Sequence, residues 1–181
     1  PSDPPISESL SEPASPEASE RREEPAPVEP IYIFENTVRE KSFTLTDGGE
    51  EIASYSYSIP MLRVENEDEL SASDREVSQR NVLAFNQEME TVLADAVSFG
   101  ESLGEDMRLI FEEEEQMWVG RDENVGTATR SGEIITVLFR CYYYGGGAHP
   151  NTYSVSRTFD LTLGQFIDPA QIADDPEAFR T

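Results

Sequence analysis

The feature that most constrains the fold of this chain is a stripe of apolar residues near its middle. Between residues 82 and 103, apolar side chains recur at alternating intervals of three and four, which is the spacing of one face of an α-helix. The stripe consists of Val82, Phe85, Met89, Val92, Ala96, Phe99 and Leu103, and Leu93 and Val97 widen it. Such a stripe can bind a partner, but most cover a core, so we predict a long helix that packs on a sheet.

The ends of this helix are marked by capping and by glycine. Ser73 and Glu76 fit a capping box at its start, and Gly100 and Gly104 are expected to weaken it near its end. Residues 106–118 can add a further turn or two. The four consecutive glutamates at 112–115 can form a cation site or a solvated face. Calcium loops alternate ligands with turn residues, so we favour the solvated face.

Two pairs of strands flank the helix. Before it, residues 31–45 and 52–59 are rich in β-branched and aromatic residues and are joined by a TDGGE turn, with Pro60 ending the second strand or lying at a sheet edge. After it, residues 124–130 and 134–144 form a hairpin that turns near Ser131 and Gly132. A GGGAHPN loop then leads to a strand over 152–161. The predicted fold class is α+β, an antiparallel meander of hairpins packed on the amphipathic helix.

The last long strands have clear faces. Ile135, Val137, Phe139, Cys141 and Tyr143 alternate along one face of the first. Cys141 is the only cysteine, so no disulfide can form within the chain, and we interpret it as a small buried hydrophobe. A nucleophilic role would require a cation beside it to stabilise the thiolate.

Composition divides the chain into two parts. Residues 1–30 hold eight of the twelve prolines and eight acids but no aromatic residue, which predicts a disordered acidic tether. Residues 31–181 are expected to form one domain, with an N-terminal module over 31–120 and a C-terminal module over 121–181. Two Asp-Pro pairs, at 168–169 and 175–176, resemble helix starts, so the natural domain is expected to continue beyond Thr181.

The net charge of −24 limits the possible partners. So acidic a surface repels the phosphate backbone, which argues against nucleic-acid binding, and it would speed encounter with a basic protein. Solubility alone is the simpler explanation of the charge. No apolar run approaches the roughly twenty residues of a membrane span, so any membrane attachment would use an anchor outside this chain.

No catalytic motif is evident, and we predict a non-enzymatic protein without cofactor or metal. His149 is the only histidine, which excludes a multi-histidine zinc site within one chain. His149 could act as a general base with Asp160 as its orienting carboxylate, but we favour a structural role in capping the loop. The three glycines at 145–147 could cradle an anion, although they more simply allow positive φ angles. Tyr142 and Tyr144 could stack on a sugar or anchor a protein.

The C-terminal third resembles a motif of extracytoplasmic bacterial domains. In that motif a strand ends in aromatic residues, Gly-Gly-Ala-His and Asn follow, and a second strand leads to an acidic residue, a glycine and a helix. The matching residues are Tyr142, Tyr144, Gly146, Gly147, Ala148, His149, Asn151, Phe159, Asp160, Leu161, Gly164 and Phe166. The stretches IASYSYSIPMLR and RNVLAFNQEM resemble the module that precedes the motif. This chain differs by the additional Gly145 and by a shortened last helix.

Domains of this kind include the lysozyme-binding ectodomain of the anti-sigma factor RsiV and the non-catalytic N-terminal region of the deacetylase PdaC. The resemblance implies a lipid- or membrane-anchored domain on the extracellular face of the cell, with a C-terminal part similar to an Hsp70 ATPase subdomain. It implies a non-catalytic binding or sensor function, with lysozyme as the basic partner. The alternatives are a module that binds peptidoglycan glycan and, least favoured, a hydrolase using His149. The expected ligand-binding residues are Tyr142, Tyr144, Gly146, Gly147, His149 and Asn151.

Overall fold

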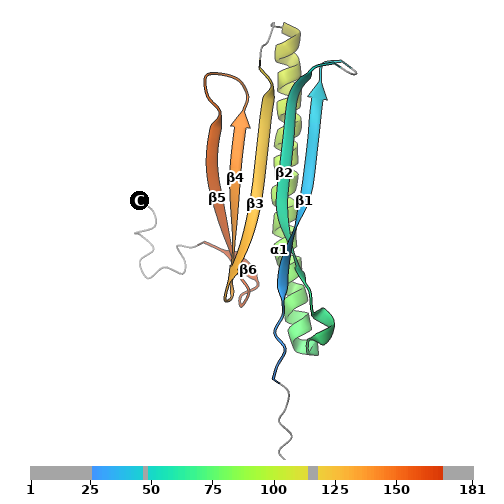
Figure 1. Ribbon diagram of the computed structural model, residues 1–181, viewed down its shortest axis with the longest axis vertical. Helices are drawn as coiled ribbons and strands as arrows, with labels where there is room; N and C mark the ends of the chain where they lie inside the picture. Colours follow the sequence, from blue (N-terminus) through green and yellow to red (C-terminus); the bar gives the residue numbers. More distant parts are fainter. Residues whose placement is uncertain (1–25, 47–48, 114–117, 169–181) are drawn as a thin grey trace, which may run out of the picture.

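The protein, analysed as a computed structural model, has one long helix packed on one face of a six-stranded sheet (Figure 1). The structure describes residues 26–46, 49–113 and 118–168. Most of the predicted tether, part of the glutamate run and the residues expected to begin helices after Asp168 therefore lie outside the described residues. The elements are β1 Tyr32–Thr44, β2 Glu51–Val64, the 3-10 turn η1 Glu67–Glu69, α1 Ala72–Glu113, β3 Gly120–Ser131, β4 Ile134–Tyr144, β5 Asn151–Asp160 and β6 Gln165–Ile167.

The sheet confirms the predicted α+β class and corrects its topology. The strands lie in sequence order, and every adjacent pair is antiparallel except β2 and β3, which run parallel from Ala53 opposite Gly120 to Ser58 opposite Val125. The prediction of an antiparallel sheet was wrong for this one pair. Because α1 carries the chain back along the sheet between β2 and β3, the second of these strands starts at the same end as the first.

Helix α1 is longer than predicted and begins earlier. It has 42 residues, which corresponds to a length of about 60 Å. Its cap is Ser71 rather than Ser73, because the Ser71 hydroxyl accepts a hydrogen bond from the Asp74 backbone amide at 3.2 Å. The Ser71 hydroxyl also donates a hydrogen bond to the Asp74 carboxylate at 2.6 Å. Asp74 is therefore the acidic partner of the cap, the role predicted for Glu76.

The buried face of α1 follows the predicted stripe and then departs from it. Phe85 and Met89 are fully buried, but Phe99 is 50% exposed, and Leu103 and Met107 are buried further along. A three-four repeat has a period of 3.5, so it drifts around a helix of 3.6 residues per turn by about 20° per heptad. The sequence pattern predicted that Phe99 lies in the core. The drift instead turns its side chain toward the edge of the buried face, where it is exposed.

Gly100 and Gly104 lie inside α1 and are buried, and the helix continues past both. They were expected to weaken the helix near its end; they instead allow the sheet to approach. A Cβ at Gly100 would lie 2.4 Å from Tyr55, and one at Gly104 would lie 2.4 Å from Phe43. These glycines therefore fix the close approach of α1 to β1 and β2.

The core lies between α1 and the sheet. Its largest buried side chains come from several strands and the helix, and include Tyr57, Ile59, Leu62, Phe85, Ile135, Val137 and Phe159. Strand β2 continues through Pro60 to Val64, so of the two alternatives predicted for Pro60, the end of the strand was wrong. The ladder between β2 and β3 ends at Ser58, and Pro60 therefore lies where no β3 residue requires its missing amide.

Candidate functional site

The residues predicted to bind a ligand lie in the loop between β4 and β5 and at the adjoining ends of these strands. The Tyr144 hydroxyl donates a hydrogen bond to the Gly147 carbonyl at 3.0 Å, which closes the loop on itself. Gly146 and Gly147 have φ angles of 104° and 100°, which confirms the predicted use of glycine. Gly146 also lies against Trp118, whose Nε1 would be 2.2 Å from a Cβ at that position. Gly146 thus allows the loop to pack closely on Trp118.

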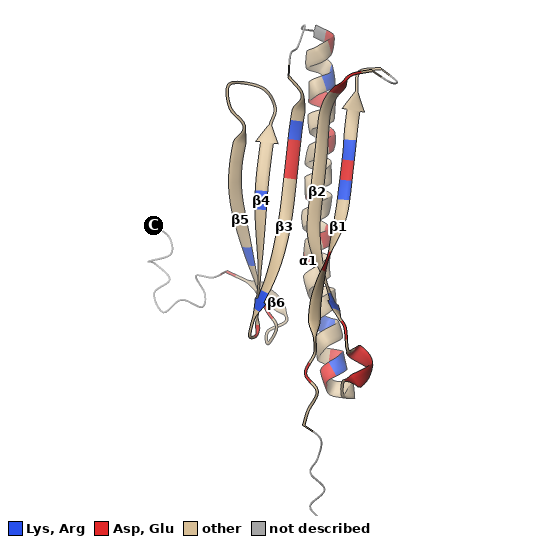
Figure 2. Cartoon of the chain, viewed as in Figure 1, with Lys and Arg blue, Asp and Glu red and all other residues tan. Residues whose placement is uncertain are grey.

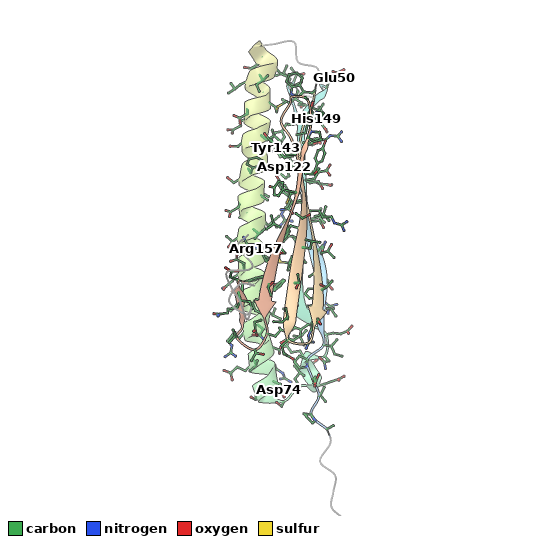
Figure 3. All side chains as sticks on the ribbon, turned by 90° about the vertical axis from the view of Figure 1, so that its left-hand side faces the viewer. Glu50, Asp74, Asp122, Tyr143, His149 and Arg157 are labelled. Carbon is green, nitrogen blue, oxygen red and sulfur yellow. The ribbon has the colours of Figure 1, made fainter. Side chains whose placement is uncertain are left out.

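His149 is exposed at the β4–β5 loop, as Figure 3 shows. No hydrogen bond or ion pair reaches its imidazole from the residues that the structure describes, so the predicted capping role is not observed. Asp160 lies at the opposite end of β5, roughly 30 Å away along a ten-residue strand, and accepts hydrogen bonds from the Thr162 and Leu163 amides. The sheet register therefore separates His149 from the carboxylate proposed to orient it.

A cavity of about 380 Å³ lies instead between α1 and the helix-facing side of β3, β4 and β5. Helix α1 packs mainly against β2, which leaves this part of the sheet incompletely covered (Figure 1). The cavity is lined by Tyr57, Val92, Asp95, Ala96, Phe99, Asp122, Glu123, Asn124, Cys141, Tyr143, Asn151, Tyr153 and Arg157. Of the six predicted ligand-binding residues, only Asn151 lines it.

The inner wall of the cavity is a hydrogen-bonded pair of Tyr57 and Asp122. The Tyr57 hydroxyl donates to Asp122 Oδ2 at 2.5 Å. Burial raises the pKa of Tyr57, and the hydrogen bond to Asp122 raises it further, so the phenol keeps its proton. Burial also raises the pKa of Asp122, although the Tyr57 hydrogen bond opposes the change. Asp122 is therefore a half-buried carboxylate that would gain from a cationic neighbour.

The rim of the cavity is aromatic. The rings of Phe99 and Tyr143 lie 5.4 Å apart at 60°, across the space between α1 and β4. Figure 3 shows Tyr143 beside Asp122, its register partner on β3. Tyr153, which is 57% exposed, continues the rim onto β5. A ligand in this cavity would meet both carboxylate oxygens and ring faces.

Cys141 lies on the wall of the cavity and is half-buried. Burial raises the pKa of its thiol, and the negative charge of Asp122 acts in the same direction, while a hydrogen bond with Tyr153 opposes them. The thiol is therefore held protonated, which does not suit a nucleophile. Cys141 was predicted to be a small buried hydrophobe, and in the structure it is only partly buried.

The charge of the lining is predominantly negative. Asp95 and Asp122 contribute carboxylates, and Arg157 contributes the only cation of the lining. Glu123 follows Asp122 in β3, so its side chain points to the other face of the sheet, with its register partner Tyr142. The Arg157 guanidinium already forms an ion pair with Glu88 on α1. Among the described residues, no group of three or more His, Cys, Asp or Glu side chains is placed to hold a metal ion. The carboxylates and aromatic rings of the cavity together suit an organic cation.

Most of this site could not be read from the sequence. The predicted strand began at residue 124, so Asp122 and Glu123 were left outside the sheet. One part of the cavity could be predicted: the alternation of residues in β4 placed Cys141 and Tyr143 on the same face of the strand, and both line the cavity. Tyr142 and Tyr144 were predicted to bind a ligand, whereas Tyr143 is the tyrosine of β4 that faces the cavity.

Within the described segments, no helix combines the length and the apolar character that crossing a bilayer would need. No known protein family matches the sequence, and no curated protein is similar to it.

Two of the solved structures that the chain matches belong to bacterial proteins of the DUF3298 family. The protein from Bacteroides fragilis has a TM-score of 0.54 and 9% identity, over 76% of this chain and 59% of that one. The protein from Pseudomonas aeruginosa has a TM-score of 0.44 and 14% identity, over 83% and 62%. The chain thus spans about three-fifths of the length of these proteins. In its fold, this chain is similar to a bacterial domain of the DUF3298 family.

Proposed function

We propose that this chain is a non-catalytic binding domain that recognises a basic protein, with the cavity between α1 and β3–β5 receiving a cationic side chain of that protein. The observation that carries the proposal is the composition of the cavity. Two carboxylates, from Asp95 and Asp122, share it with the rings of Tyr143 and Phe99.

This combination of groups is suited to a lysine or arginine side chain. A cation over an aromatic ring gains about 0.5–2 kcal/mol, depending on how far it is desolvated. A carboxylate beside it forms a charge-assisted hydrogen bond, which is stronger than one between neutral groups. Because burial raises the pKa of Asp122, a bound cation would also relieve the cost of keeping its charge there.

The net charge of −24 supports the same kind of partner. Long-range attraction raises the rate of encounter with a basic protein and weakens as salt screens it. Charge steering by itself gives no defined site, whereas the cavity offers one. A specific complex should therefore weaken with salt without disappearing at a moderate ionic strength.

Lysozyme is the partner that we propose, and the extracellular face of the cell is the proposed location. The support is the resemblance of the GGAH-type stretch, from Tyr142 to Asn151, to the domain found in RsiV and PdaC. The acidic, proline-rich residues 1–30 would hold the domain away from an anchor that lies outside this chain. The proposed similarity of the C-terminal part to an Hsp70 ATPase subdomain follows from the same resemblance.

Isothermal titration calorimetry with a basic lysozyme, at low and at moderate salt, tests this function. We expect a one-to-one complex at low salt that persists, more weakly, at moderate salt. The absence of binding at low salt would remove the proposal. Binding that vanishes with a modest addition of salt would reduce it to charge steering without a specific site.

Recognition of peptidoglycan glycan is the second candidate. It is favoured by the exposed ring of Tyr153 beside Tyr143, because tyrosine rings stack on sugars. Tyr144, which was expected to take this role, has its hydroxyl engaged by the Gly147 carbonyl. A peptidoglycan pull-down with Tyr153→Ala and Tyr144→Ala separates these residues. Equal retention of wild type and Tyr153→Ala would exclude stacking at the cavity.

A further inference from the structure

The edge of β5 is a second recognition feature next to the cavity. Strand β6 pairs with β5 only from Thr158 to Asp160, and β4 occupies the other side of β5 along its whole length. From Asn151 to Arg157, the outer side of β5 has no strand partner among the described residues. Residues 151–156 are all exposed.

Two backbone hydrogen bonds show which groups face this open edge. The Leu161 amide donates to the Glu133 carbonyl at 2.8 Å, toward β4, and the Asp160 carbonyl accepts from the Gly164 amide at 2.8 Å, away from β4. Backbone groups of an antiparallel strand alternate between its two neighbours. The pairing of β5 with β4 has no bulge, so the amides and carbonyls of Thr152, Ser154 and Ser156 point outward.

This edge lacks the usual protection against strand pairing. Natural sheets guard their edges with charges, prolines or bulges. The opposite edge of the sheet, β1, has Glu35, Arg39, Glu40 and Lys41. Figure 2 shows these charges on β1 and none on β5 above the band of Arg157. An unprotected edge of about seven residues beside a cavity is typical of a surface that accepts a strand.

We propose that the open edge of β5 between Asn151 and Arg157 accepts an extended segment of the basic partner as an added strand. This inference rests on the proposed function, because it describes how the same partner is held. Backbone hydrogen bonds to Thr152, Ser154 and Ser156 would supply affinity, and alternate side chains of the added strand would supply specificity. A second copy of the chain is a poor occupant, since each copy carries a net charge of −24.

The position of the cavity determines which partner side chains matter. Tyr153 and Arg157 lie on the helix-facing side of β5, and both line the cavity. Inward-pointing side chains of an added strand would lie next to them. A lysine or arginine opposite Tyr153 would reach its ring and the carboxylate of Asp122 beyond it. The partner segment should therefore be extended and should carry a basic residue flanked by apolar or polar neighbours.

A proline at Ser154 tests the edge directly. Ser154→Pro removes an outward amide and places a ring where the added strand would pair, while proline is tolerated at an unpaired edge position. Ser154→Thr is the matched control, because it keeps the amide. Affinity for a basic lysozyme at low salt is measured for both, after circular dichroism confirms that each is folded. We expect about a tenfold weaker complex for the proline variant and an almost unchanged one for threonine.

Hydrogen exchange of the wild-type chain gives a second measure that needs no variant. The amides of Thr152, Ser154 and Ser156 should exchange more slowly when lysozyme is added, whereas those on the outer side of β1 should not change. Wild-type binding with an unaffected Ser154→Pro variant, or without added protection on β5, would overturn the edge inference and leave the proposed function standing. No wild-type binding would overturn both. A dimer of the free chain that Ser154→Pro dissociates would assign the edge to a second copy, against this proposal.

Discussion

Replacing Gly100 with alanine should destabilise the fold, although alanine is the better helix former. A Cβ at Gly100 would lie 2.4 Å from Tyr55 Cδ1, 2.8 Å from Tyr55 Cγ and 2.6 Å from the Tyr57 hydroxyl. Ordinary contacts begin near 3.4 Å, so both rings, which are stacked 4.9 Å apart, would have to move. The Tyr57 hydroxyl would then leave its position beside Asp122.

The magnitude follows from three effects. Overpacking of a filled core costs about 1–3 kcal/mol. Weakening of the hydrogen bond between Tyr57 and Asp122 adds about 1 kcal/mol, and the change from glycine to alanine in a helix returns about 1 kcal/mol. We therefore expect the free energy of unfolding to fall by about 2 kcal/mol, with a Tm lower by roughly 4–8 °C.

Urea denaturation, followed by circular dichroism, measures this change as a shift in midpoint at constant slope. Ser98→Ala is the control for helix propensity, because Ser98 is exposed on the same helix. Tyr55→Leu should make room for the added methyl group, so the double variant should be less destabilised than the sum of the single variants. A Gly100→Ala variant as stable as the wild type, or additive behaviour in this cycle, would refute the packing argument.

Three further variants or reactions probe other parts of the structure. Ser71→Ala should cost about 1 kcal/mol of stability and Ser73→Ala almost nothing, and equal losses in urea denaturation would contradict the observed cap. Burial raises the pKa of Asp122, so the folded state binds the proton of this carboxyl more tightly than the unfolded state does. The ionised carboxylate therefore lowers the free energy of unfolding at neutral pH, and this destabilisation disappears as pH falls through the pKa of the folded state. Asp122→Asn should accordingly gain stability over wild type at pH 7 and lose that advantage in acid, and an advantage that grows in acid would show the opposite sign. Because burial raises the pKa of the Cys141 thiol, iodoacetamide at pH 8 should modify it more slowly in the folded chain than in urea, whereas equal rates would indicate an accessible thiolate.

Local patterns in the sequence were sufficient for the helix, the five long strands and much of the core, but not for β6. The alternation in 134–144 correctly placed Ile135, Val137 and Phe139 inside, because a strand repeats every two residues wherever it lies in a sheet. The helical stripe predicted the burial of Phe85 and Met89 for the equivalent reason. These features depend on one element at a time.

Features that depend on two elements were missed. The parallel pairing of β2 with β3 follows from the path of α1, which no local pattern encodes. The cavity exists because α1 lies over β2 rather than across β4 and β5, so neither Asp122 nor Tyr153 is marked in the sequence as a neighbour of the other. Gly100 likewise resembled a helix-weakening residue, since its real partner, Tyr55, lies far away in the chain.

The most direct test of the account compares two variants that lose the same charge at different places. Asp95→Asn with Asp122→Asn removes two carboxylates from the cavity, and Asp68→Asn with Glu69→Gln removes two from η1, outside the cavity. Calorimetry with a basic lysozyme at low salt should show about a tenfold or greater loss of affinity for the cavity variant and about a twofold loss for the other. Equal losses in the two variants, or full affinity in the cavity variant, would contradict a cation-binding cavity.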